Sequence, residues 1–388
     1  MIRIKKVRTV LFVLCICMLA GLPLSAFDWG GFVLNDTGIK GPANADFIKN
    51  FTQANRLTLW MRTPLPNLKD SYFAAEGFYD FKYSYRDKTI KHAIDLTLAK
   101  FSMSVNEPGL NLTFNMGRYG IADLSGFIFA QNADGMELRF KAEKWDAKFY
   151  AGYTGFLNAD TVNMNIPQLA EGNKVYQAAP PIVIGSAFAS FPQLFKQQTL
   201  SCEVTALGAA HDPALFTTLS LHGPVNPLFY AVSSTLAFTH SGTKPLLFSN
   251  ISRFELTAYF PIMSSFVSWN TVFATGSTGK KIGEFKSLSI IPANLSGSLK
   301  YAGHVKTGLT GSIKPISSLL CTLNTDMFFN VMNASPAKGF AGAQWQAAVR
   351  WQIYNDLQLS VSAGQFFAAS AQKTAPYTLT GIRLLYSF

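Results

Sequence analysis

The feature that most restricts the fold of this chain is a strict alternation of apolar and polar residues over long stretches. In WQAAVRWQIYNDLQLSVSAG, residues 345–364, Trp345, Val349 and Trp351 take alternate positions between polar or small neighbours. A period of two places them on one face of a strand. Turn-forming residues at 354–356 separate this run from a second one of the same kind. The pair predicts a hairpin with one apolar and one polar face.

The same alternation recurs in other segments along the chain. The strands it predicts are about 9 to 15 residues long. Strands of soluble sandwiches average ~5 to 6 residues, whereas a tilted strand needs ~9 to 11 to cross a bilayer. A soluble sandwich, which also alternates, is the alternative. The segments include NRLTLWMR at 55–62, YFAAEGFYDFKYSYR at 72–86, LNLTFNM at 110–116, GMELRFKAE at 135–143, FELTAYF at 254–260 and NLSGSLKYAGH at 294–304.

Composition and connection lengths favour a closed membrane sheet. The chain is 48% hydrophobic and 14% aromatic, yet no apolar run of 18 residues follows the first 26, which excludes helical spans there. In lipid an open sheet edge would leave amides unpaired, so the sheet must close. Short turns such as NEPG and KPIS alternate with long connections, as in outer-membrane barrels. The long connections are expected at 36–54, 120–133, 157–196 and 276–293.

The first 26 residues predict a cleaved secretory signal peptide. Four basic residues between Arg3 and Arg8 precede the apolar run VLFVLCICMLAGLPL, and the small residues Ser25 and Ala26 follow it. We expect cleavage after Ala26, so residues 1–26 are the leader and residues 27–388 are one barrel domain. Of the four cysteines only Cys202 and Cys321 lie beyond the leader, too few for a disulfide framework or a metal site.

The chain ends in TGIRLLYSF, a strand whose last residue is aromatic. This ending resembles the C-terminal assembly signal of bacterial outer-membrane proteins, although Arg383 stands where that signal often has glycine. The resemblance implies a porin-like barrel in the outer membrane of a diderm bacterium, with the barrel assembly machinery and periplasmic chaperones as partners during biogenesis. The residues that carry it are Gly381, Ile382, Leu384, Tyr386 and Phe388.

Parity fixes the expected number of strands. The alternating segments give 17 clear strands, but single-chain bacterial barrels have even numbers. We therefore expect a hidden strand at 180–191, within the long connection 157–196. The predicted fold is all-β: a single transmembrane antiparallel up-and-down β-barrel of about 18 strands, with 16 as the alternative.

Charged residues on the polar face are the candidates for lining a pore. Acidic and basic candidates are equal in number, so they predict no ion preference. The basic candidates are Arg56, Arg62, Lys82, Arg139, Lys141, Lys148, Lys300, Arg350 and Arg383, and the acidic ones are Glu76, Asp80, Asp95, Glu137, Glu143, Asp146, Glu203, Glu255 and Asp326.

One connection has the charges expected of a constriction. Residues 117–135 combine Arg118, Asp123 and Asp134 after a strand, and a loop folded inward would place these charges at a narrow point. The alternative is an ordinary extracellular loop. For the apolar part of residues 157–196 the same two alternatives remain, a segment that constricts the lumen and an ordinary extracellular loop.

These features predict a channel for passive diffusion of small hydrophilic solutes. The alternatives are a substrate-specific transporter with a plugged or constricted lumen, and a surface-exposed adhesin. The five histidines are scattered, so we expect neither an enzyme, a metal site nor a cofactor. The net charge of +11 is dispersed and does not predict nucleic-acid binding. Expected partners are outer-membrane lipid, small solutes and, as one option, further copies of the chain.

Overall fold

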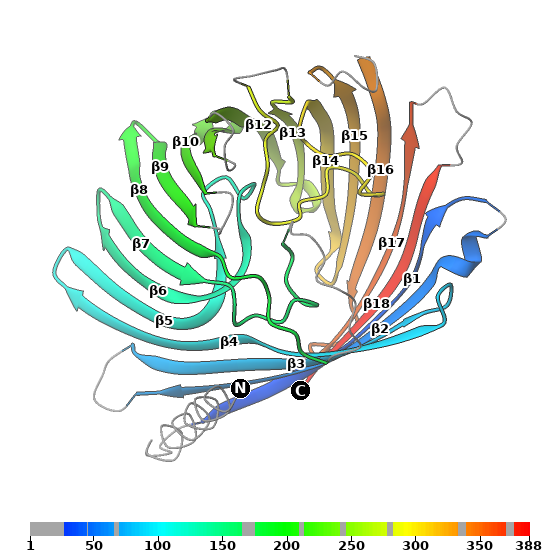
Figure 1. The fold of residues 1–388 in the computed structure, drawn as a ribbon, viewed down its shortest axis with the longest axis horizontal. Coiled ribbons are helices and arrows are strands. Elements are labelled where there is room, and N and C mark those ends of the chain that lie inside the picture. The colour runs from blue at the N-terminus through cyan, green and yellow to red at the C-terminus, as the bar shows by residue number, and fades with distance from the viewer. Residues whose placement is uncertain are drawn as a thin grey trace.

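A computed structural model of the chain contains 18 strands in one sheet (Figure 1). It describes residues 27–44, 46–65, 70–164, 175–208, 213–240, 246–277, 282–332, 339–369 and 376–388. The expected leader lies outside the described residues. The strands are β1 Asp28–Pro42, β2 Phe51–Pro64, β3 Tyr72–Ser84, β4 Thr89–Glu107, β5 Leu110–Ala122, β6 Ala130–Ala142, β7 Asp146–Tyr153, β8 Val183–Phe195, β9 Gln198–Gly208, β10 Ala214–Val225, β11 Leu228–Thr239, β12 Leu247–Phe260, β13 Ser265–Ala274, β14 His304–Ile316, β15 Leu319–Asn330, β16 Gly339–Gln352, β17 Leu357–Ala368 and β18 Tyr377–Ser387.

The sheet is closed. Each strand pairs antiparallel with its sequence neighbours, and β18 pairs with β1 from Ser387 opposite Phe32 to Tyr377 opposite Pro42. Closure joins the first strand to the last, so the sheet has no edge strand, as lipid requires. The predicted up-and-down barrel of 18 strands is confirmed. The expected hidden strand is also confirmed, as β8.

Alternation assigns the two faces of the wall as expected. Leu57, Val349, Trp351 and Val361 are exposed on the outer surface, while their neighbours point into the barrel. No helix among the described residues has the length and apolar character needed to cross a membrane. The only described helices are two short 3-10 turns, Phe47–Asn50 and Ile262–Ser264.

The two ends of the barrel differ. Short turns join the strands at the end where β1 starts and β18 finishes, and longer connections join them at the opposite end. The connections after β5, β7 and β13 lie inside the ring of strands in Figure 1. They determine which part of the inner wall remains accessible.

The prediction of a strand at 294–304 is wrong. Except for His304, which starts β14, these residues belong to the β13–β14 connection. Asn294 accepts from the Leu299 amide (3.2 Å) and donates to Ser296 (2.9 Å), while Gly297 has a φ of +67°. Such local side-chain bonds compete with strand pairing. Two expected pore-lining residues therefore leave the strands: Lys300 lies in this connection, and Glu143 lies in the β6–β7 turn.

Candidate functional site

Three connections meet inside the barrel and bond to one another. The Leu288 and Ser289 amides donate to the Ile128 carbonyl at 2.9 and 3.1 Å, and the Ala130 amide donates to the Ser289 hydroxyl at 2.9 Å. The Ile290 amide donates to the Asn163 carbonyl at 2.9 Å. We call this unit the constriction. It comprises residues 123–129, the described parts of the β7–β8 connection (154–164 and 175–182), and 275–277 with 282–303.

An apolar cluster fixes the constriction to the wall. Loop residues such as Ile128, Phe129 and Phe285 are buried against inward residues of the wall. Phe127 meets Tyr301 edge to face at 5.4 Å, and burial raises the pKa of Tyr301 to about 12. The wall residues of the cluster are Tyr119, Ala133, Tyr150, Ile184, Leu207, Phe216, Ala237, Ile251, Val272 and Ala274. A second cluster packs Ala293 of the β13–β14 connection against Phe328 of β15 and Phe366 of β17. Loops therefore cover the inner wall from the end of β5 to β17.

Asp123 organises the first of these loops. Its carboxylate accepts hydrogen bonds from the amides of Ser125, Ile128 and Phe129 at 2.7 to 2.9 Å, and from the Ser125 hydroxyl. The Leu124 amide in turn donates to Glu203 on β9. Asp123 thus holds loop 123–129 in shape, because the amides of this loop bind its carboxylate.

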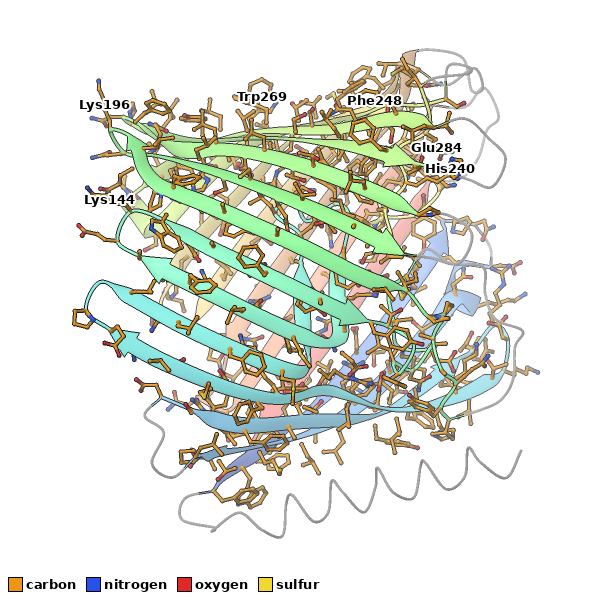
Figure 2. All side chains as sticks on the ribbon, turned by 60° about the vertical axis from the view of Figure 1, so that its left-hand side comes forward. Lys144, Lys196, His240, Phe248, Trp269 and Glu284 are labelled. Carbon is orange, nitrogen blue, oxygen red and sulfur yellow. The ribbon has the colours of Figure 1, made fainter. Side chains whose placement is uncertain are left out.

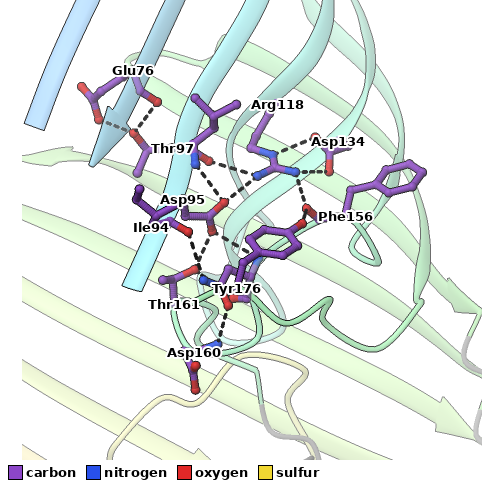
Figure 3. A network of polar contacts seen from close by, with 12 residues as sticks. Glu76, Ile94, Asp95, Thr97, Arg118, Asp134, Phe156, Asp160, Thr161 and Tyr176 are labelled. Atoms are coloured by element: carbon purple, nitrogen blue, oxygen red, sulfur yellow. Dashed lines mark hydrogen bonds and ion pairs between the residues drawn. The ribbon is translucent and has the colours of Figure 1, made fainter. Parts of the chain in front are cut away.

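Arg118 and Asp134 lie in the wall, because the connection is only 123–129 and not 117–135 as expected. Arg118 is on β5 and Asp134 opposes it on β6. The guanidinium binds Asp134 through Nε and Nη2 at 2.8 and 2.9 Å, and Asp95 of β4 through Nη1 at 2.8 Å (Figure 3). The structure therefore separates Asp123 from this ion-pair network.

Two cations interact with aromatic rings and carboxylates near the long-connection end of β2 and β3. Arg56 forms a bidentate pair with Asp80 at 2.6 and 2.8 Å and stacks 4.0 Å above Phe78. Lys82 approaches Asp80 at 3.5 Å and stays half-exposed. These groups belong to the part of the wall that the constriction leaves accessible.

A second group of cations has no carboxylate partner. Arg62 lies 4.1 Å above Tyr72, and Lys100 lies 5.8 Å from Tyr72 and 5.4 Å from Tyr119. Among the described residues neither cation has an ion-pair partner. Since Tyr119 belongs to the apolar cluster, Lys100 marks the border between the constriction and the accessible wall.

Charged side chains that the loops cover differ from these accessible cations, because protein groups bind them. Asp326 of β15 is bonded by Gln344 at 2.7 Å, Asn324 at 2.8 Å and Lys306 at 3.2 Å, and its side chain is 0% exposed. Glu203 is buried and bonded by Ser186. These charges are held by protein groups beneath the loops.

The other predicted pore-lining residues are on strands, and their pairing places them on the inner face. Arg139 pairs with Asp146, and Arg383 pairs with Asp36. Glu255 pairs with Arg253, Glu76 accepts from Thr97, and Glu137 accepts from Asn115. Lys141, Lys148 and Arg350 have no ion-pair partner among the described residues.

Pairing also identifies inward cations that the sequence analysis missed. In β4 a bulge opposite Glu76 and Gly77 shifts the alternation, so Lys91 lies inward before it and Lys100 lies inward after it. A strict period of two cannot orient both. The others are Lys40, Arg253 and Lys306. Pairing also places Asp28 and Asp36 inward, opposite Arg62 and Arg383. Because five cations but only two carboxylates are added, the inward charge of the strands has a basic excess.

In the described part of the chain, no group of three or more His, Cys, Asp or Glu side chains could hold an ion.

Comparison with known proteins gives matches by structure. No protein-family model matches the chain, and neither does any curated protein. A BenF-like porin from Pseudomonas fluorescens superimposes with a TM-score of 0.63 at 8% identity, over 94% of this chain and 100% of that one. Pseudomonas aeruginosa OccK5 (OpdH) gives 0.61 at 11% identity, over 93% and 98%.

A third similar structure is Pseudomonas aeruginosa OccK2 (OpdF) in complex with glucuronate, with a TM-score of 0.60 at 8% identity over 93% and 98% of the two chains. At such identities the likeness concerns the fold. The chain therefore has the closed 18-stranded barrel fold of these outer-membrane porins.

Proposed function

We propose that this protein is an outer-membrane channel for small hydrophilic solutes and that it favours anions. The observation that carries the proposal is the set of inward cations without carboxylate partners. Chief among them are Lys100, which borders the constriction at Tyr119, and Arg62, which shares the Tyr72 ring with Lys100. In a narrow lumen the effective dielectric constant is lower than in bulk water, so such charges act strongly on a passing ion.

Two similar structures support the choice of anion. Pseudomonas aeruginosa OpdK was solved with vanillate and OccK2 with glucuronate, and both ligands are carboxylates. The proposed solutes of this chain are likewise small carboxylates. The constriction favours a selective channel over a wide general one, because three connections fill part of the lumen. It does not favour an adhesin, which would present these connections outward.

The test is a planar-bilayer measurement on the refolded mature chain. Under a KCl gradient we expect discrete current steps and a reversal potential of the sign for chloride preference. The double variant Arg62→Gln with Lys100→Gln removes two unpaired lumen charges, so its permeability ratio should move toward cations by about threefold, on the order of 0.7 kcal/mol.

The matched control is Lys88→Gln with Lys196→Gln, which removes two exposed charges from connections outside the lumen. It should leave the reversal potential unchanged. Cation preference in the parent protein, or an equal shift in both double variants, would contradict the proposal.

We also propose that the chain is exported by its leader and assembled through its last strand. The Phe388 amide donates to the Gly31 carbonyl at 2.9 Å, and the Gly31 amide donates to the Phe388 carbonyl at 3.0 Å. Deleting Phe388 removes this closing pair and the terminal aromatic. We expect export to continue while outer-membrane assembly falls at least tenfold, measured by heat-modifiable migration of membrane fractions. Phe388→Tyr keeps the backbone pair with Gly31 and a terminal aromatic side chain, so this variant should assemble. Normal assembly of the deletion variant would contradict this account.

A further inference from the structure

The wall contains a seam between β4 and β5. These strands pair only from Glu107 opposite Leu110 to Ala99 opposite Arg118. Beyond this point β4 continues to Thr89, paired on its other side with β3. Figure 3 shows the place where β4 and β5 part and the β7–β8 connection approaches.

Side chains and loop backbone replace strand pairing at the seam. The Ile94 amide donates to the Val175 carbonyl at 3.3 Å, and Asn158 Nδ2 donates to the Ile94 carbonyl at 3.0 Å. Arg118 Nη1 donates to the Leu96 carbonyl at 3.2 Å. Backbone groups in a membrane wall need such partners. At Ile94 and Leu96 the seam is therefore bridged by hydrogen bonds without being a continuous sheet.

A pocket of about 560 Å³ opens at this seam. Most of its lining consists of outward side chains that are about half exposed, with Phe156 and Tyr176 of the β7–β8 connection. The outward side chains are Leu57, Leu59, Tyr79, Ile94 and Leu96. Pockets that hold small ligands span ~300 to 1,000 Å³. The pocket faces the lipid side near mid-height of the wall: Leu57 and Leu59 lie opposite Val33 and Gly31 of β1, and Ile94 and Leu96 lie in the long-connection half of β4.

The charged floor of this pocket has no free hydrogen-bonding capacity for a ligand. Arg118 has five N–H donors. It uses two on Asp134, one on Asp95 and one each on the Leu96 and Phe156 carbonyls. Asp95 also accepts from Thr161 at 2.6 Å. A polar head group would find no partner there, so the floor fits an apolar occupant.

We propose that the seam is a binding site for a single acyl chain of an outer-membrane lipid. Three features together point to it: a concave apolar lining on the lipid-facing surface, a saturated polar floor, and a hydrogen-bonded loop that closes the wall behind it. The site rests on the membrane location included in the proposed function. It is independent of which solute the lumen conducts.

The test uses the refolded mature chain in detergent with hexadecanol bearing a mid-chain diazirine, an uncharged probe that lumen cations do not attract. After irradiation, mass spectrometry should place saturable labelling on peptides containing 57–59, 94–96 and 156. A tenfold excess of plain hexadecanol should reduce it at least fivefold. Even labelling around the belt that resists competition would overturn the proposal.

Variants that fill the pocket provide the specific control. Leu96→Trp, or Leu59→Trp if the first does not refold, should lower seam labelling at least fivefold. Leu309→Trp is the match, since Leu309 is an equally exposed outward leucine of β14. An equal loss in Leu309→Trp, or no loss in either filling variant, would overturn the site. The bilayer assay on the same samples reports the channel separately, so failure of the site and failure of the channel are distinguishable.

Discussion

The two parts of the inner wall have the same alternation and opposite environments. On the strands that the loops leave accessible, Arg56, Lys82 and Arg383 keep 35%, 53% and 57% of their side-chain surface exposed. Beneath the constriction, Lys306 keeps 17% and Asp326 keeps none. Figure 2 shows the two ends of the wall, with Lys144 and Lys196 in short turns at one end and His240 and Glu284 in longer connections at the other. Strand alternation thus decides that a charge points inward, and the loops decide whether it meets the solute.

This difference has an energetic consequence. A covered charge must be paired, because removing its partner leaves an ion in a low-dielectric site. An accessible charge remains solvated, so it can act on a passing ion at little cost in stability. The charges of the covered wall stabilise the constriction, and those of the accessible wall set selectivity.

The largest expected effect comes from releasing the loop that separates the two parts. Asp123→Ala removes the acceptor for three amides and one hydroxyl, each bond to a charged group being worth about 1.5 to 3 kcal/mol. We expect loop 123–129 to leave the wall and single-channel conductance to rise at least twofold. Asp46→Ala, in an exposed connection, should leave it unchanged. Unchanged conductance in Asp123→Ala would mean that this loop does not narrow the lumen.

A smaller effect should separate covered from accessible cations in stability. Lys306→Met leaves the buried Asp326 carboxylate without its cation, which should lower the free energy of unfolding by about 3 kcal/mol. Lys82→Met should change it by about 1 kcal/mol or less, because Lys82 is half-exposed. Urea unfolding in lipid vesicles measures both. Equal changes would remove the energetic distinction between the two parts of the wall.

The smallest expected effect is the response of selectivity to salt. The Debye length falls from about 10 Å at 0.1 M to about 3 Å at 1 M, so accessible cations are progressively screened. The chloride preference should therefore decline as both KCl solutions are concentrated at a fixed ratio. A preference that stays constant would indicate that it arises from charges shielded from the solution.

Much of the barrel was predictable because a strand with one face in lipid must alternate. The hairpin at 345–364 and the hidden strand at 180–191 followed from local patterns and from parity. The failures were local too. The segment 294–304 alternates, but Asn294 and Gly297 turn it into a loop. At the β4 bulge an extra residue shifts the period, so Lys91 and Lys100 could not both be oriented.

The candidate site depended on contacts between distant segments. Ile128, Asn163 and Ser289 meet although more than a hundred residues separate the last from the first two. Arg118 reaches Asp95 and the Phe156 carbonyl only because β4 and β5 part at the seam. No period in the sequence encodes such meetings.

The sequence by itself determined the closed barrel, its strand number and the face on which each regular strand residue lies. Those properties follow from a local period and from the requirement that lipid leaves no backbone group unpaired. Only the tertiary structure decided which inward charges are covered, where the wall has a seam and which groups Asp123 and Arg118 bind. Those properties follow from loop packing, in which residues far apart in the chain exclude water together.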